Sequence, residues 1–457
     1  MTALFGTDGI RGRAGQFPLD PPTLPLIGRA IGERLGGLLL IGRDPRESGP
    51  QICESLRVGL EAGGASIQDA GIIPTPAIAL LTRDSMLGGG IMISASHNPF
   101  KDNGIKVFGP DGRKIDDEDE TKIEARVAEL QAESGAAMNP SGSVGSGSWP
   151  EDVGEELQTR YLELLRKRFP EGKWLEGLSL TLDCANGAMS SLAPAFLESL
   201  GARVETIHSN PDGININVDC GAVHPESLVE AVGRNGSDLG VAYDGDGDRS
   251  MFVDSTGRII DGDGVLLVMA RLLDQSGNLE PKLVVGTSMT NYNLERKLQD
   301  EGIGLVRVDV GDRFIFRKML ESGACLGGEP SGHLIFPDFR LSGDGLLSTL
   351  KLCQAMTGQS SSLAELTRDW QPAPHLLENV RVSERIPLDT LPPIEGKIDE
   401  IRATLKGRGR IVVRYSGTEP LLRVMVESDS DAMNRTCADE LIAVIEAELG
   451  ASGPRQK

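Results

Sequence analysis

The segment with the most reactive side chains is Ser94-Ala-Ser-His-Asn-Pro99, which directly follows an apolar run at residues 91–93. In an open parallel sheet, ligands bind beyond the carboxyl ends of the strands, where this segment would lie. A serine hydroxyl there can act as a covalent nucleophile or carry a phosphoryl group, if a neighbour manages its proton and charge. The competing interpretation is an ordinary turn, in which the serines and the asparagine bond to their own backbone.

A second segment, Asp244-Gly-Asp-Gly-Asp-Arg249, places three carboxylates at alternate positions after the apolar run 239–242. Alternate side chains of an extended backbone point to one side, and the intervening glycines also let the chain bend so that the oxygens converge. Such charges repel unless a cation lies among them, and hard oxygen ligands select Mg²⁺ or Ca²⁺. An EF-hand is excluded, because Arg249 and Ser255 occupy the positions that require Gly and Glu. The sequence predicts a divalent-metal site, with a solvated acidic turn as the alternative.

Two further segments carry groups suited to recognition. Gly328-Glu-Pro-Ser-Gly-His333 combines a carboxylate, a hydroxyl and an imidazole, which suit sugar hydroxyls and proton transfer near neutral pH. Arg414-Tyr-Ser-Gly-Thr418, followed by Arg423, offers guanidinium groups, hydroxyls and backbone N–H groups to a phosphate dianion. It lacks the Gly-Lys-Ser/Thr signature of a nucleotide P-loop.

Two cations stand next to flexible backbone, Arg11 within residues 5–12 and Lys106 within residues 102–106. Each is also compatible with an ordinary surface turn that carries a solvated cation. Taken together, the five segments supply a carrier hydroxyl, a cation site, a reader of sugar hydroxyls and a phosphate clip. That set is suited to phosphoryl transfer on a phosphosugar.

The composition fits an α/β enzyme. The 457 residues include 57 glycines and only 4% aromatic residues, which favours many strand-to-helix turns over an aromatic-rich binding module. Subtracting 67 acidic from 46 basic side chains gives a net charge of −21, which argues against nucleic acid or an anionic membrane as the main partner. No secretory signal or membrane-length apolar run is present, and six cysteines occur without a C-x-x-C pair. We therefore expect a cytoplasmic protein with reduced, mostly buried thiols.

Strand, loop and helix signals recur along the chain and predict βαβ-like units, hence parallel sheets covered by helices. The strongest unit has a strand at 180–183, a helix at 192–200 and a strand at 204–207. Small polar residues at 134–148 predict a linker, and Gln371-Pro-Ala-Pro374 precedes a smaller α+β unit. The expected domains are 1–150 with the serine segment, 151–254 with the aspartates, 255–371 with the sugar segment and 372–457 with the phosphate segment.

The motifs at 5–12, 94–99, 244–249, 328–333 and 414–420 resemble those of the α-D-phosphohexomutase superfamily in order and spacing, over essentially the whole chain. The resemblance implies three related α/β domains with mixed sheets and a smaller C-terminal α+β domain around a central cleft. One departure is Pro330, where close relatives usually have glutamine; it bears on the fine positioning of Glu329 and Ser331 and not on their identity.

The resemblance also assigns roles to single residues. Ser96 would carry the phosphoryl group as a phosphoserine, and Mg²⁺ would be held by Ser96, Asp244, Asp246 and Asp248. Glu329 and Ser331 would bind sugar hydroxyls. The non-reacting phosphate would be bound by Arg414, Ser416, Gly417, Thr418 and Arg423. Proton transfer or charge stabilisation would fall to Arg11, Lys106, Arg249 and His333.

The reaction implied is the interconversion of glucosamine 6-phosphate and glucosamine 1-phosphate through a 1,6-bisphosphate, which would feed amino-sugar nucleotide and cell-wall precursor synthesis. A phosphomannomutase/phosphoglucomutase would use the same chemical parts. A non-catalytic phosphosugar-binding protein and a metal-dependent hydrolase are further alternatives. The implied partners are small phosphosugars, without nucleic acid or membrane, and the oligomeric state stays open, a homodimer included.

Overall fold

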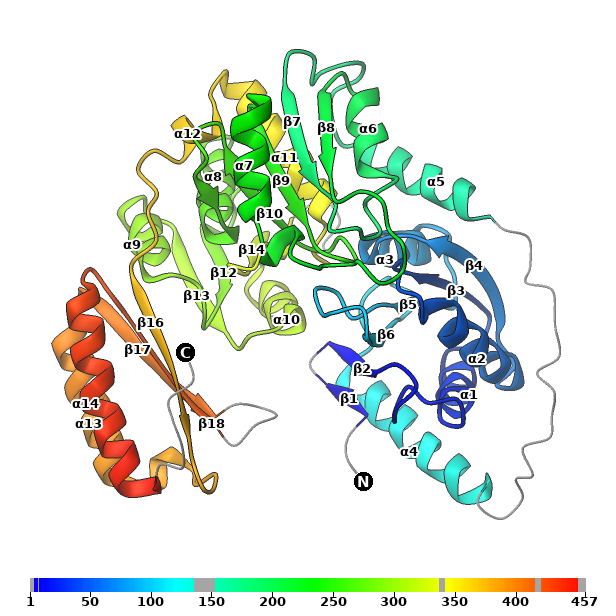
Figure 1. The fold of residues 1–457 in the computed structure, drawn as a ribbon, viewed down its shortest axis with the longest axis horizontal. Coiled ribbons are helices and arrows are strands. Elements are labelled where there is room, and N and C mark those ends of the chain that lie inside the picture. The colour runs from blue at the N-terminus through cyan, green and yellow to red at the C-terminus, as the bar shows by residue number, and fades with distance from the viewer. Residues whose placement is uncertain (1–3, 7, 135–152, 337–341, 416–420, 451–457) are drawn as a thin grey trace. The chain divides into compact units, whose positions relative to one another are not determined.

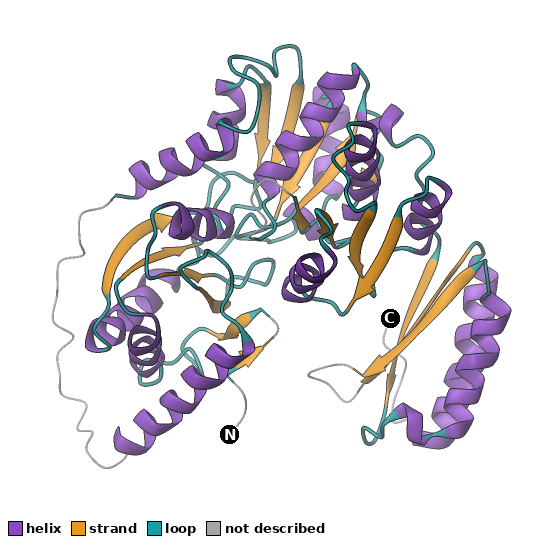
Figure 2. Cartoon of the chain, turned by 180° about the vertical axis from the view of Figure 1, so that it is seen from behind, coloured by secondary structure: helices purple, strands orange, loops and turns teal. Residues whose placement is uncertain are grey.

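The computed structural model describes residues 4–6, 8–134, 153–336, 342–415 and 421–450. The chain forms two compact units, one of residues 1–287 and 308–368 and the other of residues 288–307 and 369–457. Helices and strands alternate along most of the first unit (Figures 1 and 2). The four domain boundaries expected above remain a prediction, because the two compact units divide the chain in another way.

The first sheet of the larger unit runs in the order β1-β2-β6-β5-β3-β4. Its strands are β1 (Phe5–Gly6), β2 (Gly9–Arg13), β3 (Leu38–Arg43), β4 (Ser66–Ile72), β5 (Gly89–Ile93) and β6 (Asp102–Phe108). Strand β3 is parallel to β4 and β5, whereas β6 is antiparallel to β5 and β2. Alternate apolar side chains of these strands share a core with the helices α1 (Leu24–Leu35), α2 (Gly49–Ala62) and α4 (Asp117–Ser134). Helix α3 (Thr75–Asp84) also packs against β3 and β5.

The second sheet runs in the order β11-β10-β9-β7-β8. Its strands are β7 (Ser179–Asp183), β8 (Arg203–Ile207), β9 (Leu239–Tyr243), β10 (Ser250–Asp254) and β11 (Ile259–Ile260). Strand β7 is parallel to β8 and β9, and β10 is antiparallel to β9. The accompanying helices are α5 (Gly154–Arg166), α6 (Ala193–Ser199) and α7 (Glu226–Asn235).

The third sheet joins β14 (Leu326–Gly328) in parallel to β12 (Leu283–Thr287) and antiparallel to β15 (Leu334–Ile335). Its helices are α8 (Gly262–Gln275), α10 (Asp312–Ser322), α11 (Gly345–Gln359) and the short α12 (Leu363–Leu366). Helices α8 and α10 both pack on β14.

One arrangement recurs in the three sheets: a strand that is parallel to one neighbour turns back into an antiparallel partner. The serine segment joins β5 to β6, the aspartate segment joins β9 to β10, and the Glu329 segment joins β14 to β15. The parallel pairing expected from the strand and helix units is present, but each sheet also contains an antiparallel pair. The sheets are mixed, as the family resemblance implied, because no helix separates the two strands of each hairpin.

The smaller unit contains an antiparallel sheet of order β16-β18-β17. Its elements are β16 (His375–Arg381), α13 (Pro392–Leu405), β17 (Gly409–Tyr415), β18 (Leu421–Ser428) and α14 (Asp431–Leu449), together with α9 (Tyr292–Asp300) and most of β13 (Gly304–Val308). Asn291 Nδ2 donates to Glu427 Oε1 at 2.6 Å, and Arg410 donates to the carbonyls of Ser288 and Thr290. These bonds explain why residues 288–307 belong with the C-terminal residues.

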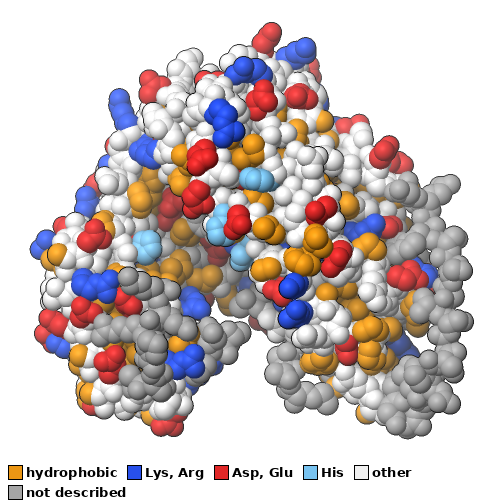
Figure 3. Space-filling view, in the orientation of Figure 1, with side chains coloured by type: hydrophobic (Ala, Val, Ile, Leu, Met, Phe, Trp, Pro, Cys, Tyr) orange, Lys and Arg blue, Asp and Glu red, His pale blue; other side chains and the backbone are white. Residues whose placement is uncertain are grey.

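Two simpler expectations, on the cysteines and on membrane spans, can be compared with the described residues. All six cysteines are unpaired and buried. None of the helices described is both long and apolar enough to cross a membrane. On the face shown in Figure 3, acidic and basic side chains of the described residues are interspersed. Nearly all of the predicted linker, from residue 135 onward, lies outside the described residues.

A buried carboxylate ties α5 to α11. Asp344 caps α11, with Oδ1 accepting from the backbone N–H of Leu347 at 2.9 Å, and the hydroxyl of Tyr161 donates to its Oδ2 at 2.9 Å. Burial raises the pKa of Asp344 to about 6, although both hydrogen bonds favour the ionised form. The folded protein therefore holds a proton on Asp344 at pH values where the unfolded chain, with an aspartate pKa of about 3.9, has released it.

This raised pKa predicts how the Asp344→Asn variant responds to pH. In the wild type, Asp344 lowers the free energy of unfolding as pH rises from about 4 to above 6, by roughly 3 kcal/mol at about 1.36 kcal/mol per pKa unit. Asparagine is also a good N-cap and does not titrate. As pH rises over this range, the free energy of unfolding of the variant should thus increase relative to that of the wild type. Urea unfolding at several pH values tests this, and a difference independent of pH would contradict it.

Candidate active site

Ser96 lies in the serine loop, residues 94–101, which joins β5 to β6. Its Oγ donates a hydrogen bond to Oδ2 of Asp244 at 2.6 Å and lies 3.3 Å from Nδ1 of His97. The side chain is fully buried, and its backbone has φ 54°, which is uncommon for a residue other than glycine. The predicted carrier hydroxyl thus touches the predicted metal ligands directly.

His97 adds no positive charge to the serine loop at neutral pH. Burial, followed by the nearby charges of Arg249 and Arg11, lowers the pKa of His97 to about 4. The imidazole beside Ser96 is therefore neutral.

The aspartate loop, residues 244–249, follows β9 and forms a turn. The backbone N–H of Gly247 donates to the carbonyl of Asp244 at 3.1 Å, and Gly247 has φ 71°. The three buried carboxylates converge, with one oxygen of each within 4.8 Å of the others. The convergence depends on this glycine turn and not on alternation along an extended strand.

Lys106, on β6, is the cation nearest to these acids. It is 1% exposed, and its Nζ lies 2.8 Å from Oδ2 of Asp246 and 3.1 Å from Oδ2 of Asp248. Burial opposes its charge, but these carboxylates and Asp8 raise the pKa of Lys106 well above its ordinary value. Lys106 therefore stays charged and balances part of the negative charge of the loop.

The acids of the loop differ in protonation. Burial, followed by the charges of Asp248 and Asp246, raises the pKa of Asp244 well above its usual range. Burial acts in the same direction on Asp248, but Lys106 and His333 hold the pKa of Asp248 well below its usual range. Asp248 therefore remains ionised, whereas Asp244 retains a proton more readily than Asp248.

The aspartate loop has the chemistry of a metal site. Oδ1 of Asp246 and Oδ1 of Asp248 are buried and have no hydrogen-bond partner among the described residues. Buried carboxylate oxygens without partners are costly, and a divalent cation would satisfy both. Hard oxygen donors suit Mg²⁺ and Ca²⁺. The carboxylate group can therefore hold a metal ion.

The segment at residues 328–333, which holds the predicted sugar-binding groups, packs against β10, the strand that follows the aspartate loop. Glu329 accepts hydrogen bonds from the backbone N–H of Gly311 at 3.0 Å and from the hydroxyl of Ser331 at 3.2 Å. A Cβ on Gly332 would lie 2.1 Å from the carbonyl oxygen of Ser250, so only glycine permits this approach to β10. The structure thus brings Glu329 and Ser331 close to the aspartate loop.

His333 and Arg249 also reach the aspartate loop. Nε2 of His333 accepts a hydrogen bond from the N–H of Gly343 at 2.8 Å, which assigns the proton of the neutral ring to Nδ1. That Nδ1 lies 3.8 Å from Oδ2 of Asp248. Burial opposes the charge of Arg249, but Asp248 and Asp244 raise the pKa of its guanidinium. Arg249 therefore remains a fixed cation.

Sequence reasoning missed three charged residues beside this cluster. Lys114 Nζ forms ion pairs with Asp8 and, at 2.6 Å, with Asp312. Asp8 also pairs with the predicted Arg11 and lies 3.5 Å from Nζ of Lys106. Asp8 lies inside the motif at residues 5–12 that carried the family resemblance, so a signal existed for it, whereas Asp312 lies in none of the five motifs. Lys114 belongs to no such motif.

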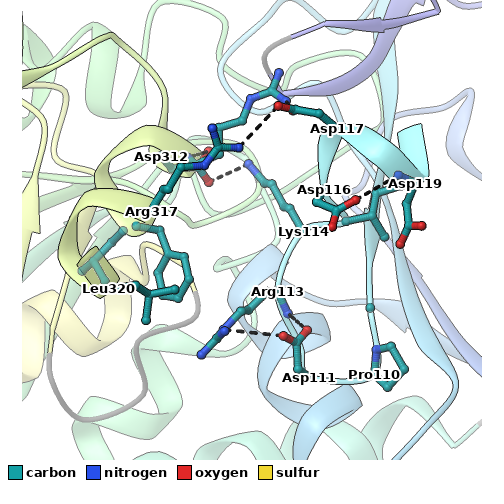
Figure 4. Close-up of a pocket in the computed structure, with 15 residues that line it drawn as sticks. Pro110, Asp111, Arg113, Lys114, Asp116, Asp117, Asp119, Asp312, Arg317 and Leu320 are labelled. Carbon is teal, nitrogen blue, oxygen red and sulfur yellow. Dashed lines mark hydrogen bonds and ion pairs between the residues drawn. The ribbon is translucent and has the colours of Figure 1, made fainter. Parts of the chain in front are cut away.

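A cavity of about 480 Å³ lies between residues 109–119 and α10 (Figure 4). Several of its charged side chains are already paired, as the dashed lines show: Lys114 with Asp312, Arg113 with Asp111 and Arg317 with Asp117. None of the described site residues predicted from the sequence lines this cavity. It adjoins the charged network but is not the predicted reaction site.

The predicted phosphate clip belongs to the C-terminal unit. Arg414 and Arg423 stand directly opposite each other on the antiparallel pair β17 and β18. Like charges in that position repel, and a bound anion would relieve the repulsion. The intervening Ser416, Gly417 and Thr418 lie outside the described residues.

Comparison with known proteins agrees with this geometry. Family models for phosphoglucomutase/phosphomannomutase match in chain order: alpha/beta/alpha domain I at residues 2–134, domain II at 159–257, domain III at 261–373 and the C-terminal domain at 377–444.

Relatives at the level of whole chains give the same result. A phosphoglucosamine mutase of Koribacter versatilis is 43% identical over 455 residues, covering 98% of this chain and 97% of that protein. One of Brucella ovis is 42% identical over 453 residues, covering 98% and 99%. The crystal structure of a phosphoglucomutase/phosphomannomutase family protein from Burkholderia thailandensis superimposes with a TM-score of 0.79 at 25% identity, covering 99% of each chain. The chain therefore belongs to the phosphoglucomutase/phosphomannomutase family of the α-D-phosphohexomutase superfamily.

Proposed function

We propose that this protein is a phosphoglucosamine mutase, which interconverts glucosamine 6-phosphate and glucosamine 1-phosphate. The observation that carries the proposal is the 2.6 Å hydrogen bond between Ser96 and Asp244, which joins a carrier hydroxyl to a buried acid cluster. The choice of substrate is supported by similarity, because the chain resembles phosphoglucosamine mutases over nearly its whole length.

In the proposed reaction, phosphorylated Ser96 donates its phosphoryl group to O1 of glucosamine 6-phosphate. The bond between Oγ and phosphorus breaks, a bond between O1 and phosphorus forms, the proton of O1 passes to a nearby base, and Oγ takes up a proton. The 1,6-bisphosphate then reorients in the site. The bond between O6 and phosphorus breaks and the bond between Oγ and phosphorus forms again, with the proton of Oγ passing to a nearby base and O6 taking up a proton. The residues proposed to move protons or stabilise charge are Arg11, Lys106, Arg249 and His333.

Charge decides whether such a transfer can occur. A phosphoserine carries about −1.5 to −2 charges at pH 7, and the substrate brings a second phosphate. Lys106 and Arg249 are fixed cations beside the acids. Mg²⁺, held by Asp244, Asp246 and Asp248 with the Ser96 phosphate, would supply the remaining neutralisation of the transferring group.

The remaining roles follow from the same proposal. Glu329 and Ser331 would bind sugar hydroxyls near the aspartate loop. Arg414 and Arg423, with Ser416, Gly417 and Thr418, would hold the phosphate that does not react. A cytoplasmic location and an open oligomeric state, a homodimer included, stay predictions from the sequence.

The covalent role of Ser96 predicts the behaviour of a Ser96→Ala variant. Its turnover should fall to background, because no other step replaces the phosphoserine. Intact-mass analysis should find a phosphate adduct on the wild type and none on the variant. Ser55 lies on α2, a helix that packs against the same sheet, and Ser55→Ala is the matched control. It should retain both the turnover and the phosphate adduct. Full activity of the Ser96 variant would eliminate the covalent mechanism.

The metal role predicts the effect of Asp246→Asn. The variant keeps the shape of the side chain but removes one charged ligand, so Mg²⁺ affinity should fall roughly tenfold or more, and the rate at limiting Mg²⁺ should fall with it. Calorimetric titration of metal-free protein and the Mg²⁺ dependence of turnover measure these effects. Asp274 lies on α8 and forms an ion pair with Lys282, and Asp274→Asn is the control. Unchanged binding by the Asp246 variant would mean that the loop is only an acidic turn.

Substrate preference separates this proposal from a phosphomannomutase/phosphoglucomutase. We expect phosphorylated enzyme to convert glucosamine 6-phosphate with a higher kcat/KM than glucose or mannose phosphates in direct competition. Side activity on glucose phosphate is compatible with the proposal, because a few polar contacts set the preference. Preference for a 2-hydroxyl sugar would favour the alternative.

A further inference from the structure

Arg46 is a charged side chain with no solvent exposure, and it lies against the serine loop. A guanidinium has five N–H donors, and each of these finds an acceptor. Nε donates to Oδ2 of Asp44 at 2.9 Å. The other four donate to carbonyl oxygens of Ser96 at 2.9 Å, Asn98 at 2.8 Å, Asp102 at 3.0 Å and Pro99. Because four of its five donors bond to backbone carbonyls, the buried guanidinium of Arg46 holds the backbone of this loop in place.

The partner of Arg46 also reaches the loop from its other end. Oδ2 of Asp44 accepts a hydrogen bond from the hydroxyl of Ser94 at 2.6 Å. That same hydroxyl oxygen accepts the backbone N–H of Ser96 at 2.8 Å. The Asp44 and Arg46 pair therefore fixes both the amide and the carbonyl of Ser96.

Asn217, on the loop 208–221 that follows β8, contacts two of the same carbonyls. Its Nδ2 donates to the oxygens of Ser96 at 2.9 Å and Asn98 at 3.1 Å. Its own backbone N–H donates to the carbonyl of Ala185 at 3.0 Å, which anchors it to the loop after β7 of the second sheet. The loop after β3 and the loop after β8 thus each supply one donor side chain to these two carbonyls.

The aspartate loop also packs against the carbonyl oxygen of Ser96. A Cβ on Gly245 would stand 2.6 Å from the oxygen of Ser96 and 2.8 Å from Nδ2 of Asn217. The serine loop, the aspartate loop and Asn217 therefore meet at one point. Displacement of the Ser96 carbonyl would also move its hydroxyl relative to Asp244.

This geometry explains how Ser96 keeps a left-handed backbone. Its φ of 54° is unfavourable for a residue with a Cβ, and such strain persists only where neighbours over-determine the conformation. Hydrogen bonds to both its amide and its carbonyl do so here. With the backbone fixed, rotation about χ1 is the freedom that remains for the hydroxyl.

We propose that Arg46 and Asn217 are positioning residues, which clamp Ser96 so that its hydroxyl is held at the aspartate loop and turns only about χ1. The inference rests on the proposed function for its kinetic consequence, but the clamp itself is a property of the loop. Both side chains act on main-chain carbonyls of the serine loop and not on reacting atoms.

The sharpest test is Asn217→Asp, which replaces a donor by a carboxylate facing two carbonyl oxygens. Arg46→Lys is the second variant, because lysine has three donors where five are used. Asn215→Asp is a matched control, since Asn215 lies in the same loop and donates to Asn210 within that loop. Arg57→Lys controls for a mostly buried arginine, which forms ion pairs with Glu54 and Glu61 of the same helix.

Two measurements are made on each full-length protein. Hydrogen exchange of the peptide covering residues 94–104 should accelerate in Asn217→Asp and Arg46→Lys but not in the controls. In the mutase assay, kcat per phosphorylated enzyme should fall about tenfold to a hundredfold, with KM for the sugar phosphate within about twofold. The thermal unfolding midpoint separates loss of positioning from loss of fold.

The outcomes distinguish the clamp from the proposed function. Faster loop exchange in the two variants, with no mutase activity in the wild type, would support the clamp and reject the function. Wild-type exchange and wild-type kcat in Asn217→Asp would overturn the clamp. A lower unfolding midpoint with unchanged kcat per folded, phosphorylated molecule would also overturn it, because the residues would then be structural only.

Discussion

Three buried carboxylates within one turn are the constraint on which the site depends. In a medium less polar than water their mutual repulsion is large, so the fold must bring compensating charge to them. The groups that face them come from separate parts of the chain: the charge of Lys106 from the first sheet, and the Nδ1–H of neutral His333 from the hairpin loop of the third. Their positions relative to the turn thus depend on how these sheets pack together, and the packing of the first unit is coupled to the chemistry of the aspartate loop.

The recurring hairpin positions the functional loops with only a short stretch of chain. In each of the three sheets, the strand that ends at the functional loop turns back at once into an antiparallel neighbour. Both ends of the loop are then fixed by ladder hydrogen bonds, which suits a loop that must hold side chains in place. A loop leading into a separate helix would have only one end fixed in this way.

The sequence predicted the parts of the site that are local. Ser96 and the three aspartates follow apolar strands in short, distinctive loops, and the order of the motifs indicated the family. It could not predict contacts between distant segments. Arg46 and Asn217 act on carbonyls 50 and 121 residues away, and no local pattern marks either residue. The antiparallel pairs were missed from strand and helix signals, because β10 and β15 follow loops that look like ends of elements. The grouping of residues 288–307 with the C-terminal unit depends on Asn291 and Arg410, whose partners are also remote in sequence.

A phosphorylated Ser96 would change the balance of the whole cluster. In the unmodified protein the hydroxyl donates to Asp244, whose burial favours a retained proton. A phosphoserine would replace this donor by a dianion that cannot donate to a carboxylate. Because the backbone of Ser96 is held on both sides, the phosphate could avoid the acids only through χ1 rotation or coexist with them through a cation. The proposed metal and the proposed phosphoserine would therefore each strengthen the binding or formation of the other, since linkage between two such events is reciprocal. The same turn that makes the three carboxylates costly without a cation would then favour the state that combines a bound cation with phosphorylated Ser96.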